Sequence, residues 1–239
     1  MSADLKIVRF DPLRVQTENQ LRTAITTGVF LPGQKLVERE LCEKLGISRP
    51  SLREALRRLE AEKLIVNIPH RGPMVATVSV EEARELYAVR RLLEGHAAAE
   101  CARHASTQQI QELKAAVDEL SVAIGKKSHP DILRSKQHFY AALLKGCANA
   151  LVAEILEGLH SRISLLRSTS LLFDSRLPAS LREIKGILNA ISKRDAARSH
   201  TLAQAHVANA EIAALAVLNS QTPMSDSANR NSQTNRKKS

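Results

Sequence analysis

The chain has 239 residues, enough for one large domain or two ordinary ones, and its 44% hydrophobic and 25% charged residues are usual for a globular protein. Aromatic residues make up only 3%, while alanine and leucine are abundant, so we expect a mostly helical protein. The formal net charge of +10 suits a polyanionic partner, and residues 1–78 carry 13 basic against 9 acidic side chains.

The cysteines and the hydropathy pattern bear on the compartment. The three cysteines stand singly, with no CxxC pair, which argues against a zinc finger or a redox motif. No apolar run approaches the length of a bilayer span, and no signal peptide opens the chain. We therefore expect a cytoplasmic protein with reduced thiols that does not bind a membrane.

The first 62 residues predict short helices. Residues 5–10 alternate weakly and predict a short strand or an ordered arm, and a helix follows over 18–28. A second helix is expected over about 37–45, ended by Gly46, and a third over about 49–62, with Ser48 as its N-cap. Two short helices joined by a tight glycine-containing turn indicate a helix-turn-helix.

Residues 64–78 change character. Two runs rich in β-formers, 64–66 and 74–78, enclose the basic, turn-rich loop 69–73. This pattern predicts a β-hairpin, and a hairpin directly after a helix-turn-helix is the wing of a winged helix.

From Ser79 onward the apolar residues recur only at helical spacing. Six helices are expected over about 80–104, 107–125, 130–146, 149–172, 179–193 and 195–219, with short breaks that suit an antiparallel bundle. The fold class is therefore mostly α: an N-terminal winged helix-turn-helix (1–78), then an antiparallel six-helix bundle (79–219). Residues 220–239 are rich in Ser, Asn and Gln and predict a disordered basic tail.

The third helix has an arginine face. Arg49, Arg53 and Arg57 recur every four residues and form one ridge, opposite a side lined by leucines. Such a helix fits the major groove of DNA, where arginine pairs bidentately with guanine. A solvated charged face is the simpler alternative, but the glycine turn before the helix and the basic hairpin after it favour DNA.

The stretch 21–75 resembles the winged helix-turn-helix of the GntR family. The matching segments are 31–36 (LPGQKL), 38–41 (EREL), 45–49 (LGISR), 53–59 (REALRRL) and Arg71-Gly72. The resemblance implies that the DNA contacts are Arg39, Ser48, Arg49, Ser51, Arg53, Arg71 and Gly72, with Arg71 at the wing tip and Gly72 close to a phosphate. One departure is Lys63, where the family usually has glycine.

Residues 79–219 resemble the FCD effector domain of the same family, through 86–87 (LY), 89–94 (VRRLLE), 149–151 (NAL), Glu183 and 187–191 (ILNAI). Many relatives bind a divalent metal there with one Asp and three His. Alignment through the matching residues places Lys136, Tyr140 and Ile184 at three of those positions, and only His206 agrees. Charged lysine and isoleucine cannot ligate a metal, so we expect no metal and no cofactor.

The same alignment suggests what the bundle binds instead. Lys136 lies in an apolar stripe, and a buried ammonium needs a partner, either an internal carboxylate such as Glu94 or an anionic effector. Helical phase also turns Arg90 and Arg162 inward, and several cations against one carboxylate favour the effector. The predicted effector site is therefore a set of cationic and polar side chains around a small organic anion, a carboxylate: Arg90, Lys136, Tyr140, Arg162 and His206.

Together these interpretations predict an effector-responsive repressor that binds a pseudo-palindromic double-stranded DNA operator as a homodimer. The sequence has no phosphate loop, nucleophile elbow or metal pair, so no enzymatic activity is expected. Two alternatives remain open at this point. One is a metal-dependent sensor of the same family, and the other is a constitutive DNA binder with a vestigial sensing domain.

Overall fold

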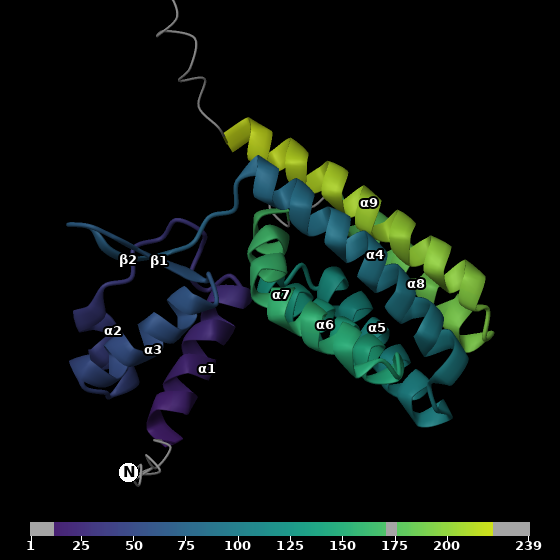
Figure 1. The fold of residues 1–239 in the computed structure, drawn as a ribbon, viewed down its shortest axis with the longest axis horizontal. Coiled ribbons are helices and arrows are strands. Elements are labelled where there is room, and N and C mark those ends of the chain that lie inside the picture. Colours follow the sequence, from purple (N-terminus) through teal and green to yellow (C-terminus); the bar gives the residue numbers. More distant parts are fainter. Residues whose placement is uncertain (1–11, 171–175, 222–239) are drawn as a thin grey trace, which may run out of the picture.

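The structure, a computed structural model, describes residues 12–170 and 176–221 and divides into an N-terminal part and a helical bundle that lie side by side (Figure 1). The arm predicted over 5–10 lies outside the described residues. So does most of the predicted tail, although its first two residues belong to the last helix, α9.

The N-terminal part is a helix-turn-helix followed by a hairpin, as predicted. It comprises α1 (Pro12–Thr26), α2 (Glu38–Leu45), α3 (Arg49–Ala61), β1 (Ile65–Ile68) and β2 (Gly72–Val75). Gly46 ends α2 with φ +63°, and the Ser48 hydroxyl accepts a hydrogen bond from the Ser51 amide at the start of α3. The two strands pair antiparallel, with Ile65 opposite Val75 and Ile68 opposite Gly72.

Lys63, the residue that departs from the family pattern, follows α3 in the left-handed region at φ +58°. Its amide donates to the Glu60 carbonyl, so the chain is held in this turn. Because glycine adopts positive φ without the steric cost of a Cβ, Lys63→Gly is expected to stabilise the protein by about 0.5–1 kcal/mol. Urea denaturation measures this change. The exposed Lys114→Gly, in the middle of α5 (Thr107–Gly125), is the opposite control and should destabilise by a similar amount.

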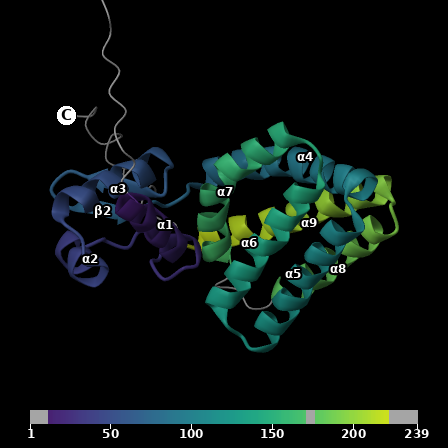
Figure 2. The same cartoon turned by 90° about the horizontal axis from the view of Figure 1, so that it is seen from below.

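Among the described residues the bundle has the six helices expected: α4 (Val80–His104), α5 (Thr107–Gly125), α6 (His129–Gly146), α7 (Ala150–Ser170), α8 (Leu177–Ser192) and α9 (Ala196–Gln221). Ser79 and Ser106 cap α4 and α5, and Ser106 with Gln109 forms a reciprocal capping box. The helix α4 packs along α9, and α5 packs along α6, on different sides of the bundle (Figures 1 and 2).

Helix α7 connects the two parts. Leu165 near its C-terminal end is buried in the apolar core of the N-terminal part, together with Leu21, Leu52 and Leu59. Its neighbour Leu166 is buried in the bundle, against Tyr87 and Val207. Gly28, just after α1, packs so closely on the bundle that a Cβ there would lie 3.3 Å from Leu133 Cδ1. The two parts thus share a packed interface.

The expectation that no apolar run approaches the length of a bilayer span was wrong. Within the described residues, one helix, Ala196–Ser220, is long and apolar enough to cross a membrane by length and composition alone. Only 28% of its most apolar stretch is buried in the protomer. Alanine gives this helix its apolar character, and alanine does not form the conspicuous leucine-type run by which spans are usually noticed.

Candidate nucleic-acid interface and effector site

The arginine ridge of α3 is exposed, and its opposite side holds the helix in place. Leu52, Leu56 and Leu59 are buried in the N-terminal core. On the outer side Arg53 Nε lies 3.1 Å from Glu38 Oε2 of α2, and Arg57 Nη1 lies 2.7 Å from Glu54 Oε1. These exposed pairs contribute little to stability, but they hold the guanidinium groups outward in the free protein.

The other predicted DNA contacts lie on the elements next to α3. Arg39 on α2, Arg49 at the first turn of α3 and Arg71 in the hairpin loop are all exposed. Gly72 has φ +81°, and a Cβ there would meet no atom within 4 Å, so the backbone is open to a close approach. A hollow between α3 and the hairpin is lined by Arg53, Arg57, Asn67 and five other residues.

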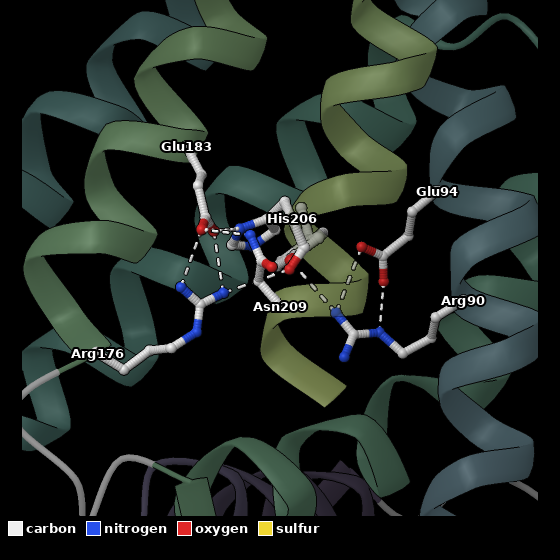
Figure 3. A network of polar contacts seen from close by, with 7 residues as sticks. Arg90, Glu94, Arg176, Glu183, His206 and Asn209 are labelled. Carbon is white, nitrogen blue, oxygen red and sulfur yellow. Dashed lines mark hydrogen bonds and ion pairs between the residues drawn. The ribbon is translucent and has the colours of Figure 1, made fainter. Parts of the chain in front are cut away.

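Inside the bundle, Arg90 and Glu94 form a buried ion pair one turn apart on α4 (Figure 3). Arg90 is 1% exposed and Glu94 is 4% exposed, and Arg90 Nε lies 2.6 Å from Glu94 Oε1. Arg90 Nη2 also donates to the Tyr140 hydroxyl at 3.3 Å. Burial alone disfavours a charged guanidinium, but the Glu94 carboxylate and the nearby tyrosines outweigh burial and raise the pKa of Arg90. Arg90 is therefore charged at every pH at which the protein folds.

The third nitrogen of this guanidinium is the unusual feature. Arg90 Nη1 is buried and has no hydrogen-bond partner among the described residues. A buried donor without a partner costs about 1–3 kcal/mol, and more when it belongs to a charged group. Natural proteins rarely leave such a donor unsatisfied unless a ligand or water takes it up.

A second network centres on Glu183 of α8 (Figure 3). Its carboxylate accepts from His206 Nδ1 at 2.6 Å and Asn209 Nδ2 at 2.9 Å, both on α9. Arg176 donates to both carboxylate oxygens, at 3.1 and 3.0 Å. Burial alone would raise the pKa of Glu183, but the hydrogen bonds from His206 and Arg176 lower it to about 2. Glu183 is thus an anion that only accepts hydrogen bonds.

The protonation state of His206 follows from these neighbours. Burial and the charge of Lys136 lower the pKa of His206, so its imidazole is neutral at pH 7 although Glu183 opposes the shift. Because ionised Glu183 can only accept, the single ring proton is on Nδ1. His206 Nε2 is then a hydrogen-bond acceptor, and α9 presents it in the same part of the bundle as Arg90 (Figure 3).

Of the predicted effector residues, Arg90, Tyr140 and His206 are buried in the same part of the bundle, and Lys136 and Arg162 differ from the expectation. Tyr140 contacts Arg90, and Lys136 is close enough to affect His206, but Lys136 is partly exposed rather than buried. Glu94, one of the two partners considered for Lys136, forms an ion pair with Arg90. Arg162 forms an ion pair with Glu82, about 12 Å before Arg90 along α4.

Three members of the site were not predicted: Arg176, Glu183 and Asn209. Glu183 is named from the sequence only as a residue that matches the family pattern. Arg176 and Glu183 are seven residues apart, which places them on one face when a helix begins near Pro178. This spacing was the signal in the sequence by which their contact could have been predicted. Their partner His206 lies on another helix, so no local pattern could have shown the contact.

The residues around His206 do not fit the metal that the family resemblance implies. Ile184 is fully buried in the apolar core, and Tyr140 is next to the charged Arg90. His206 donates Nδ1–H to a carboxylate that already binds Arg176. The described residues contain no group of three or more His, Cys, Asp or Glu side chains that could hold a metal ion. No step of the proposed function therefore involves a metal.

The fold and the two sites define a bacterial transcriptional regulator with a winged helix-turn-helix and a helical C-terminal domain. The model of the family described as "Bacterial regulatory proteins, gntR family" matches residues 13–75, and that of the FCD domain matches residues 85–209. The chain belongs to the GntR family, in its FCD branch. Transcriptional regulators of this kind are not enzymes.

Two relatives agree with this assignment, and a solved structure shares the fold. The chain is 29% identical over 203 residues to the uncharacterized HTH-type transcriptional regulator YdhC of Bacillus subtilis. The alignment covers 84% of this chain and 91% of that protein. It is 26% identical over 197 residues to the HTH-type transcriptional repressor RspR of Escherichia coli, with 82% and 86% covered. The structure of E. coli McbR/YncC superposes with a TM-score of 0.75 at 23% identity, over 89% of this chain and 99% of that one.

Proposed function

We propose that the protein is a cytoplasmic, effector-responsive repressor that binds its operator as a homodimer and is released or modulated by a small organic anion, a carboxylate. A single winged helix reads only a half-site, so a pseudo-palindromic operator requires two copies. The relative RspR is named a repressor, which favours repression over activation. In this proposal residues 1–78 bind DNA, and residues 79–219 bind the effector and the second copy.

The observation that supports the anionic effector is the buried, unsatisfied Nη1 of Arg90. A carboxylate oxygen would satisfy this charged donor, and a hydroxyl or amine on the same molecule could donate to His206 Nε2. The charges of the network agree with this assignment: Arg90, Arg176 and Lys136 are cations, against the carboxylates of Glu94 and Glu183. This net positive charge suits an anionic ligand.

Lys136→Ala is expected to abolish the response to the effector and to leave operator binding intact, because the two sites lie in different parts of the chain. A panel of small mono- and dicarboxylates is screened by thermal unfolding of the full chain. A ligand at a hundred times its Kd stabilises the folded state by about 2.7 kcal/mol, which raises Tm by several degrees.

Lys145→Ala is the matched control, because Lys145 lies on the same helix and pairs with Glu112 at the surface. This variant should respond like the wild type. A carboxylate that stabilises wild type and Lys136→Ala equally would contradict the site, and a response only to neutral compounds would contradict the class of effector.

A further inference from the structure

Two neighbouring leucines of α7 are buried in different cores. Leu165 is 1% exposed and belongs to the apolar core of the N-terminal part. Leu166, the next residue, is fully buried in a bundle core that contains Tyr87 of α4 and Val207 of α9. Consecutive residues of a helix project about 100° apart, so each leucine faces one of the two parts where α7 lies between them (Figure 1). A single turn of α7 therefore belongs to both parts.

The bundle side of this turn leads to the proposed effector site. Tyr87 is 1% exposed, and the Arg90 guanidinium lies over its ring, 4.9 Å from the ring centre. Leu166 thus belongs to the same packed cluster as the tyrosine that supports Arg90. In a close-packed interior, a ligand that displaces the Arg90 side chain also displaces Tyr87 and the side chains packed with it.

The other side of the turn leads to the DNA-reading helix α3 through α1. Helix α7 packs on α1, and α1 packs on α3. Arg22 of α1 also donates to both carboxylate oxygens of Glu62, the residue that follows α3, at 2.8 and 2.6 Å. Because this bidentate pair and the shared apolar core fix α1 to α3, a movement of α1 carries α3 with it.

We propose that Leu165 is a positioning residue for α3, and that Leu165 and Leu166 together make α7 the element that transmits effector binding to the DNA-reading helix. This inference rests on the proposed function and names the route of its regulation. Packed interiors transmit small displacements because they have few voids to absorb them. Helix shifts of about 1–2 Å are enough to switch other allosteric proteins.

The covalent linker between the two parts is the competing route. Val78, three residues after β2, also packs on both cores. It is only partly buried, however, so its side chain can yield toward solvent when one part moves. Leu165 and Leu166 have no such freedom, because both are enclosed by packed side chains. This difference favours α7 over the linker.

The test uses operator DNA as the probe, because coupling between two sites is reciprocal. Hydrogen exchange of the full chain is measured by mass spectrometry with and without an operator selected from random DNA. In the wild type, the operator should slow amide exchange around Tyr87 and Leu166 about five-fold or more. Leu165→Ala should remove this slowing, because the cavity it leaves lets α1 move without α7. Leu165→Met keeps the volume and should retain the slowing. Leu165→Val, a smaller truncation, takes the place of Leu165→Ala if circular dichroism shows that the latter does not fold.

Leu41→Ala is the matched control for a purely structural effect. Leu41 is 5% exposed in the same core but lies on α2, which is far from the bundle (Figures 1 and 2). Its truncation also leaves a cavity in this core, yet the slowing around Tyr87 should be unchanged. All variants are compared at saturating operator, so that a difference in affinity does not enter. Loss of the slowing in Leu41→Ala as well would mean that Leu165 has only a structural role.

The outcomes separate this inference from the proposed function. Slowing that survives Leu165→Ala but is lost in Val78→Ala overturns the role of α7 and assigns the transmission to the linker. No slowing in the wild type also overturns the inference, while thermal unfolding with carboxylates still tests the effector site. If no carboxylate raises Tm, the anionic effector of the proposed function fails, and the operator experiment still decides on α7.

Discussion

Alanine in place of Arg49 or Arg53 is expected to weaken specific operator binding by about 1–3 kcal/mol, a loss of roughly 5- to 150-fold. Both side chains are exposed on the ridge of α3, and Arg53 is already held outward by Glu38 at 3.1 Å. A guanidinium that pairs bidentately with guanine loses both hydrogen bonds when truncated. A mobility shift on an operator selected from random DNA measures the loss at fixed salt.

The control for this prediction removes the same charge elsewhere. Arg134 is exposed on α6 and pairs with Asp131, and Arg134→Ala changes the net charge by the same amount as Arg53→Ala. Only the ridge variants should lose discrimination between the selected operator and random DNA. If Arg49→Ala and Arg53→Ala weaken binding to both kinds of DNA equally while Arg134→Ala does not, the ridge contacts only phosphates and does not read bases.

The sequence carried enough local information to place most of the elements. Ser48 caps α3 and Gly46 ends α2, both as expected, and Ser79 and Ser106 cap α4 and α5 directly before the predicted helix starts. These signals depend on a few neighbouring residues, so they can be recognised in one sequence. The start of α1 was predicted six residues late, because residues 12–17 form helix without an apolar stripe to indicate it.

The partners of the buried charges could not be predicted in the same way. Helical phase correctly turned Arg90 toward the core, and Glu94 was at hand one turn later. Whether Glu94 pairs with Arg90 or with Lys136 depends on how α4 and α6 are placed, which no local pattern specifies. Glu183 and His206 are 23 positions apart on different helices, and Arg162 pairs with a residue 80 positions away.

Glu94→Ala should cause the largest loss of stability, about 3–5 kcal/mol, because it leaves the buried charge of Arg90 without its carboxylate. Arg90 cannot escape this cost by releasing its proton, since a guanidinium stays charged at any pH that permits folding. Urea unfolding of the full chain measures the change in the free energy of unfolding. Glu119→Ala, which removes an exposed carboxylate paired with His138, should cost less than about 1 kcal/mol.

A double variant separates the cost of an unpaired charge from the value of the pair. Replacing both partners, as Arg90→Met with Glu94→Leu, should be far less damaging than Glu94→Ala, because apolar side chains of similar volume avoid the desolvation of both ions. The double variant should also fail to bind the carboxylate that stabilises the wild type, since it lacks the Nη1 donor. Its fold would then be intact while its site is lost, which is the result expected if Arg90 is retained to bind an anion. Stability no better than that of Glu94→Ala would instead mean that the buried pair is needed for the packing of α4.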